Sequence, residues 1–195
     1  FEAPEHVCST YDNCHVPWGS THEKTWHLVK TLPHVSGLFV WTGFDYLGEP
    51  TPYWWPSRSS FFGIVDLAGF PKDVYYMYKS EWTDEPVLHI FPHWNWMEGE
   101  RVDIWAYYNN ADEVELYLNG KSLGVRQKTD STYHVSWRVP FTPGTLRAVS
   151  RLGGKEVLVK EIHTAGEPAR LVLTPDRSVI QADGSDLSFV TVDVC

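Results

Sequence analysis

The sequence predicts part of an α/β barrel, followed by an all-β immunoglobulin-like sandwich and by the start of a second sandwich. Before residue 85, a helix pattern, a short apolar run, a long loop and another helix pattern follow one another, which is the order of an α/β barrel unit. From Pro86 onward the apolar period changes to two over roughly six or seven short segments, which is typical of a sandwich. We therefore place domains at residues 1–85, 86–165 and 166–195.

The composition is that of a globular protein with many aromatic side chains. The 195 residues carry a formal net charge of −9, and 15% of them are aromatic. An acidic chain without clustered Lys and Arg matches a nucleic-acid backbone poorly, so we expect no nucleic-acid partner. We also expect no membrane-spanning segment, because no apolar run is long enough to cross a bilayer. The aromatic content is typical of enzymes that act on carbohydrates.

The cysteines and histidines predict no metal site and no cofactor. Cys8, Cys14 and Cys195 have no repeated spacing, although a local bridge between Cys8 and Cys14 stays open. His89 and His93 would share one face of a strand, but the sequence gives them no third ligand.

The first helix is predicted by a capping box and a proline. In Ser20-Thr21-His22-Glu23, the side chain of Ser20 can accept the backbone N–H of Glu23, whose carboxylate can accept the N–H of Ser20. We expect the helix to start at Thr21 and Pro33 to stop it.

The central strand is predicted from a short apolar run. Leu38, Phe39 and Val40 follow a glycine and contain no polar residue, which is the pattern of a strand buried on both faces. After the loop, a second helix is expected to open at Pro71-Lys72-Asp73 and to pack its apolar stripe on the barrel. That stripe consists of Val74, Met77, Tyr78 and Trp82.

The loop after the strand carries the candidate site. It combines the ring of Trp41 with two carboxylates, Asp45 and Glu49. Active sites of α/β barrels lie at the carboxyl ends of the strands. An aromatic face can stack on the C–H face of a pyranose while carboxylates accept its hydroxyl protons, so this loop predicts a sugar site. The other interpretation is an aromatic core strand with a polar turn. Five more rings follow: Phe44, Tyr46, Tyr53, Trp54 and Trp55.

The sandwich strands are expected at residues 87–92, 102–107, 114–118, 122–124, 133–139, 145–151 and 156–162. Asn119-Gly120 is a strong hairpin signal, and Gly153-Gly154 predicts another tight turn. After a linker at Thr164–Pro168, strands are expected at Arg170–Thr174 and Leu187–Val194. Because two or three strands cannot form two facing sheets, we expect this last domain to be incomplete.

Two runs resemble a known family. FVWTGFDYLGEPTP (Phe39–Pro52) and SRSSFFGIVDLAGFPKD (Ser57–Asp73) resemble the end of the catalytic barrel in glycoside hydrolase family 2 β-galactosidases, and Val114–Gly124 resembles their accessory sandwich. The resemblance implies the last strand and flanking helices of a TIM barrel. It further implies a retaining enzyme that cleaves terminal β-galactosides, with a periplasmic or extracellular location.

The same resemblance implies roles for the loop residues. Trp41 would stack on galactose, and Glu49 would accept sugar hydroxyls. Asp45 would either contact the sugar or brace the loop by accepting backbone N–H groups. Trp54 and Trp55 would line the aglycone side or pack under the loop.

The catalytic acids are expected to lie outside this chain. Retaining hydrolysis needs two carboxyl groups about 5–5.5 Å apart, and Asp45 with Glu49 is the tempting pair. In the family that the chain resembles, however, both acids are glutamates on the fourth and seventh strands, which would precede Phe1. We therefore expect an inactive internal fragment that depends on the remainder of its polypeptide.

Two other classes of function stay open. One is a carbohydrate-binding or adhesion module, because immunoglobulin-like sandwiches often bind without catalysing. The other is a family 2 β-glucuronidase or β-mannosidase. A uronate site needs a cation near the sugar carboxylate, and Arg58 is the candidate in the loop.

Overall fold

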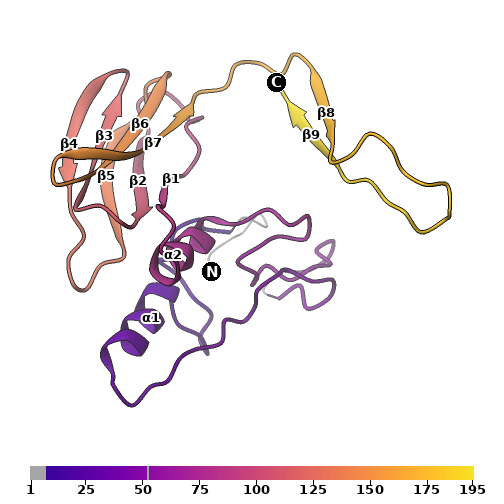
Figure 1. Cartoon of the computed structure of the whole chain (residues 1–195), viewed down its shortest axis with the longest axis horizontal. Helices are drawn as coiled ribbons and strands as arrows, with labels where there is room; N and C mark the ends of the chain where they lie inside the picture. The colour runs from indigo at the N-terminus through magenta and orange to yellow at the C-terminus, as the bar shows by residue number, and fades with distance from the viewer. Residues whose placement is uncertain (1–7, 52) are drawn as a thin grey trace. The chain divides into compact units, whose positions relative to one another are not determined.

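The computed structural model describes residues 8–51 and 53–195. The chain divides into two compact units, one ending at His163 and one from Thr164 to Cys195, and each is described by itself (Figure 1). Within the described residues, neither helix has the length and the apolar character that crossing a bilayer requires.

The first unit contains the predicted sandwich, which the structure confirms. One antiparallel sheet has the order β1-β2-β5, and the other has the order β4-β3-β6-β7. The first sheet consists of β1 (Leu88–Phe91), β2 (Arg101–Tyr108) and β5 (His134–Pro140). The second consists of β3 (Glu113–Leu118), β4 (Lys121–Arg126), β6 (Thr145–Leu152) and β7 (Lys155–His163).

The alternation of apolar residues gives the sandwich its core. Alternate side chains along the strands of both sheets point into the space between the sheets, where they are buried from solvent. Six of them have no exposed surface: Ile104, Ala106, Val114, Leu116, Leu146 and Ala148.

Both predicted hairpin turns are present. Asn119 and Gly120 have φ angles of 50° and 80° between β3 and β4, and Gly153 and Gly154 have 55° and 79° between β6 and β7. Two successive residues with positive φ form the tight turns whose twist matches that of the flanking strands.

Helix α1 (His22–Thr31) forms, but the predicted capping box is wrong. The carboxylate of Asp12 accepts the backbone N–H of His22 at 2.8 Å and that of Glu23 at 2.7 Å. Glu23 instead pairs with His134 of β5 at 2.6 Å. An ionised carboxylate binds the first N–H groups of a helix more strongly than a serine hydroxyl does, so a distant residue replaces the local one.

The strand predicted at 38–40 does not form. These residues have no pairing partner in the described part of the chain, and Phe39 is fully exposed at 103%. A barrel strand is stabilised by a hydrogen-bonded neighbour on each side, and a short apolar run cannot replace those neighbours. The predicted burial on both faces is therefore wrong for this chain, and the barrel end is not confirmed.

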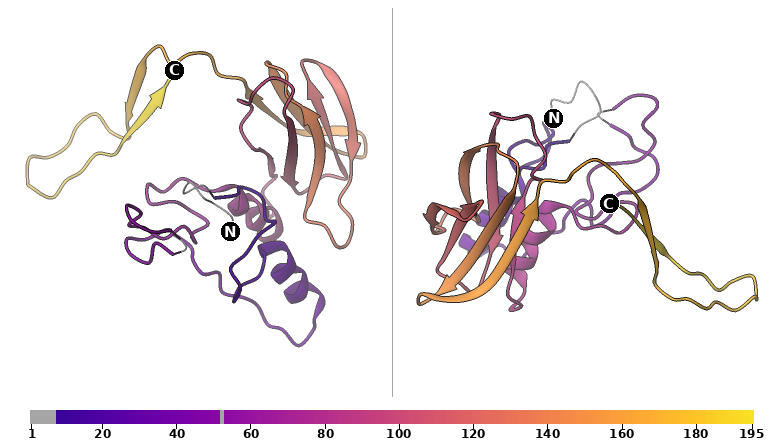
Figure 2. Two further views of the ribbon diagram at one scale, coloured as in Figure 1. Left: turned by 180° about the vertical axis from the view of Figure 1, so that it is seen from behind. Right: turned by 90° about the horizontal axis from the view of Figure 1, so that it is seen from above.

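Helix α2 (Asp73–Trp82) forms where the sequence predicts it, but its apolar stripe joins a cluster between the sandwich and the preceding segment, including Leu38, Val40 and Ile64, instead of a closed barrel. Met77 and Tyr78 are buried in a cluster with Phe91, Tyr107 and Tyr133. The helix lies beside β1 and β2 (Figure 2). The outer face of this sheet offers the nearest large apolar surface, which explains the difference.

The second unit contains one antiparallel pair, β8 (Leu171–Pro175) and β9 (Val190–Val194). Leu171 pairs with Val194, and Leu173 with Val192, so these four side chains share one face of the hairpin. All four are at least 55% exposed. The two predicted strands are confirmed, and within the described residues they carry no second sheet on their apolar face.

Candidate functional site

Backbone hydrogen bonds hold the predicted site loop in a defined shape. Val65 N–H donates to the carbonyl of Gly43 at 3.0 Å, and Asp45 N–H donates to the carbonyl of Val65 at 2.9 Å. Gly63 lies against this ladder so closely that a Cβ atom there would be 2.2 Å from the backbone nitrogen of Asp45. The loop is therefore a rigid support for the side chains that leave it.

Trp41 and Glu49, two of the predicted site residues, are joined through Tyr46. The Trp41 ring is 73% exposed and meets the Tyr46 ring edge-on, with 6.3 Å between centroids. The Tyr46 hydroxyl donates to the Glu49 carboxylate, and this hydrogen bond raises the pKa of Tyr46. The Trp41–Thr42 peptide bond is cis. An exposed ring and a carboxylate thus belong to one connected group.

Asp45, the third predicted residue, turns inward. Its side chain is 7% exposed, and its oxygens accept the backbone N–H of Gly63 and pair with the Lys72 ammonium, each at 2.7 Å. The Asp45 carboxylate therefore braces the loop, which is one of the two roles predicted for it. Sequence reasoning missed Lys72, because nothing local links a lysine at the start of a helix to a carboxylate in the preceding loop.

The other loop rings divide into two groups. Tyr53 is buried, with its hydroxyl 3.0 Å from the Cys8 sulfur, so it packs under the loop. Trp54 and Trp55 are 85% and 74% exposed. The Arg58 guanidinium lies 4.6 Å from the centre of the Trp55 ring, a cation–π contact at the rim of the loop.

Several large apolar side chains among the described residues of 39–70 are exposed. Such patches mark surfaces that another chain segment or partner covers. The side chains that are more than half exposed are Phe39, Trp41, Phe44, Leu47, Trp54, Trp55, Leu67 and Phe70.

The sandwich presents few rings of its own to a ligand. Phe91 and Tyr107 on the outer face of β1-β2-β5 are buried beneath the helical segment, and the Tyr11 ring covers Trp105 at 5.1 Å. A free carbohydrate-binding sandwich needs an exposed aromatic row, and here the aromatic row is used for packing. This arrangement disfavours the binding-module interpretation.

Comparison with known proteins shows which proteins the chain is similar to. A family model described as a domain of unknown function (DUF4982) matches residues 99–158. The β-galactosidase BoGH2A of Bacteroides ovatus is 65% identical over 188 residues, which are 96% of this chain and 22% of that protein. A solved β-glycosidase from Bacteroides vulgatus is 35% identical with a TM-score of 0.86, over 96% of this chain and 24% of that one. A solved glycosyl hydrolase family 2 member from Bacteroides cellulosilyticus is 32% identical with a TM-score of 0.77, over 88% of this chain and 27% of that one. Over most of its length, the chain is therefore similar to part of these glycosidases.

The relatives of this chain are named for activities on two different sugars. Besides the β-galactosidase, a putative β-glucuronidase of Formosa agariphila is 41% identical over 171 residues, which are 84% of this chain and 16% of that protein. The chain spans about a fifth of the length of these curated relatives.

Proposed function

We propose that the parent protein is a retaining glycosidase that cleaves terminal β-galactosides, and that this chain supplies Trp41 and Glu49 to its glycone pocket. The main support for this proposal is an exposed group of three side chains, in which the Tyr46 ring contacts the Trp41 ring and the Tyr46 hydroxyl donates a hydrogen bond to Glu49. The 65% identity to a β-galactosidase supports the choice of sugar.

The chemistry of this group suits a neutral sugar. Stacking of a pyranose on Trp41 contributes roughly 1 kcal/mol beyond the area that it buries. Tyr46 stays protonated and donates a hydrogen bond to one oxygen of Glu49. The carboxylate keeps further lone pairs that can accept hydrogen bonds from sugar hydroxyls. In this proposal Asp45 holds the loop and does not touch the sugar.

The two catalytic glutamates belong, in this proposal, to other parts of the parent. Asp45 and Glu49 make a poor catalytic pair, because both oxygens of Asp45 are already bound to Gly63 and Lys72. The exposed apolar side chains of residues 39–70 are then the surface that the remainder of the polypeptide covers.

The first experiment compares this chain with its parent on a chromogenic β-galactoside. We expect turnover by the parent and none by the chain, because both oxygens of Asp45 are already bound and the catalytic glutamates belong, in this proposal, to other parts of the parent. Hydrolysis by the chain alone would contradict the placement of both glutamates elsewhere.

The second experiment tests the sugar contact in the parent. Trp41→Ala should lower kcat/KM by about a hundredfold, because stacking and the burial of one aromatic face are lost together. Trp96→Ala, which removes a ring in the sandwich segment, should leave turnover of this small substrate unchanged. Equal effects of the two substitutions would remove Trp41 from the pocket.

A β-glucuronidase is the second candidate, favoured by Arg58 on the rim of the loop and by the 41% identical relative. The parent's kcat/KM for matched β-galactoside and β-glucuronide substrates decides between the two. If the glucuronide is preferred and Arg58→Ala abolishes that preference, the second candidate replaces the first.

Glu49→Gln should weaken the galactoside activity while leaving the loop folded, since the amide still accepts the Tyr46 hydrogen bond.

A further inference from the structure

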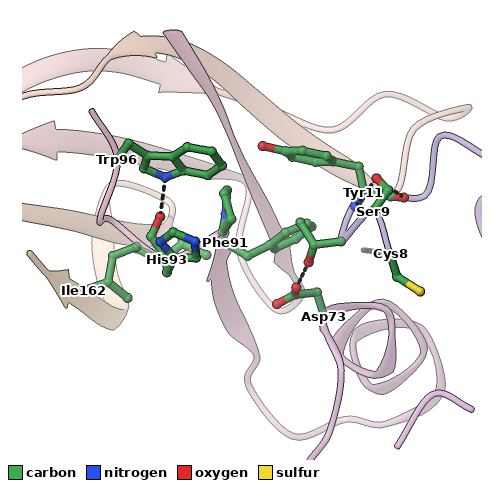
Figure 3. A pocket seen from close by; sticks show the side chains of 11 residues that line it. Cys8, Ser9, Tyr11, Asp73, Phe91, His93, Trp96 and Ile162 are labelled. Carbon is green, nitrogen blue, oxygen red and sulfur yellow. Dashed lines mark hydrogen bonds between the residues drawn. The ribbon is translucent and has the colours of Figure 1, made fainter. Parts of the chain in front are cut away.

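A pocket of about 440 Å³ lies where the segment 8–11 and the start of α2 meet β1 and the loop that follows it (Figure 3). Its lining includes Tyr11, Asp73, Phe91, His93 and Trp96, none of which belongs to the loop described above. Cavities of this size that combine apolar walls with a few polar groups are typical of small-ligand sites.

Trp96 forms a fixed aromatic wall of the pocket. Its indole N–H donates to the carbonyl of His93 at 2.9 Å, and the His93 imidazole stacks on the indole with 4.9 Å between centroids and an interplanar angle of 11°. The ring is nevertheless 37% exposed. A ligand that stacks on Trp96 therefore pays little conformational entropy for ordering it.

The pocket also offers one donor and one acceptor. His93 Nδ1 accepts the backbone N–H of Asn95 at 3.2 Å, which assigns the imidazole proton to Nε2 and makes that nitrogen a donor. The Asp73 carboxylate accepts the Thr10 hydroxyl and lies 2.7 Å from His89 Nε2. These two contacts hold the carboxylate in place, and its remaining lone pairs can accept further hydrogen bonds.

We propose that this pocket is a second binding site, for one unit of a neutral saccharide. The C–H face of the sugar stacks on Trp96, while one hydroxyl accepts from His93 and another donates to Asp73. A saccharide fits because its hydroxyls both donate and accept beside an apolar face. An anionic sugar fits less well, because its charge would face the carboxylate of Asp73.

The test titrates the full chain with lactose, cellobiose and glucuronate, using saturation-transfer NMR and calorimetry. We expect the two neutral disaccharides to bind in the millimolar range and glucuronate to bind more weakly. Trp96→Ala should raise the dissociation constant at least about tenfold, whereas Trp96→Phe, which keeps a stacking ring, should raise it less. Near-ultraviolet circular dichroism checks that each variant is folded.

The matched control separates this site from the proposed glycone contact. Trp41→Ala should leave the binding of cellobiose, which carries no galactosyl unit, unchanged, because Trp41 is not part of the pocket lining. No binding of either disaccharide overturns the proposal. Binding that is lost with Trp41→Ala and kept with Trp96→Ala also overturns it, and assigns the affinity to the site loop. Neither result bears on turnover by the parent, which tests the proposed function separately.

Discussion

The sandwich and the segment before it use similar side chains in opposite ways. In the sandwich, every strand pairs with another strand of the same domain, and together they bury a core in which Ile104 and Leu116 have no exposed surface. In the segment 8–85, Phe39 and Trp54 stand in solvent, although they are as apolar as the core residues. Whether an apolar side chain is buried here depends on whether the described residues offer a surface that packs against it.

The two regions meet in a layer of rings and ion pairs. His134 of β5 stacks on Trp105 and pairs with Glu23 of α1, while His89 of β1 pairs with Asp73 of α2. Both pairs cross from a helix to the sandwich. Both helices therefore have direct contacts with the sandwich, whereas eight apolar side chains among the described residues of 39–70 stay more than half exposed.

The largest expected effect lies in the sandwich core. Trp94 is 1% exposed, and its indole N–H donates to the carbonyl of Thr142 at 3.0 Å. Trp94→Ala should lower the free energy of unfolding by about 3–5 kcal/mol, because it leaves a cavity and an unsatisfied carbonyl. Trp54→Ala, at a ring that is 85% exposed, should change it by less than about 0.5 kcal/mol. Urea denaturation measures the free energy of unfolding of both variants. Equal losses of stability would contradict the proposed difference between the two regions.

Gly63 tests how rigid the site loop is. A Cβ atom there would meet backbone atoms of Phe44, Asp45 and Val65 at 2.2–2.6 Å. Because backbone cannot move aside cheaply, Gly63→Ala should cost about 1–3 kcal/mol locally. Gly43→Ala is the matched control, since nothing lies within 4 Å of its Cβ position. Amide exchange of Asp45 and Val65 should accelerate only in the first variant; unchanged exchange would mean that the ladder is not tightly packed.

Helix α1 separates the local pattern from the long-range contact. Asp12→Ala should destabilise the chain by about 1 kcal/mol, because two N–H groups of the first turn lose their acceptor. Ser20→Ala should have almost no effect, since Thr21 is the N-cap and has no side-chain cap bond. The thermal unfolding midpoints of the two variants show which residue caps the helix. A larger drop in the midpoint for Ser20→Ala than for Asp12→Ala would support the capping box instead.

The smallest expected effect concerns the acid stability of the contact between the regions. Burial raises the pKa of Glu81, but hydrogen bonds from Trp26 and Lys30 and the charge of Lys128 outweigh it, so the pKa is lowered. A carboxyl group with a lowered folded-state pKa stabilises the fold above its unfolded value, near 4.5, and loses that contribution as the pH falls through the folded value.

Glu81→Gln should therefore reduce the loss of stability between about pH 5 and pH 3. Glu85→Gln serves as the control, because the Glu85 side chain is 72% exposed and pairs only at the surface with Lys79. Denaturation midpoints across this pH range give the comparison. A slope that Glu81→Gln leaves unchanged would show that this carboxylate does not connect the two regions energetically.

The sequence by itself determined the elements whose partners lie nearby. Period two, Asn119-Gly120 and Gly153-Gly154 specify the sandwich hairpins, because a strand next to its partner needs only a tight turn and a matching apolar face. The grouping of Trp41 with Glu49 in one loop could also be anticipated, since the two residues lie close together in the sequence. The link between them through the Tyr46 hydroxyl could not.

Only the tertiary structure decided which contacts bridge distant residues. Asp12 caps α1, Lys72 holds Asp45, and α2 turns its apolar stripe to the sandwich. The run at 38–40 reads as a strand and forms none in this chain, because strand formation depends on neighbours that the local sequence does not contain. The physical reason is the same throughout: local patterns set what a segment can become, and the surfaces and charges available around it select the outcome.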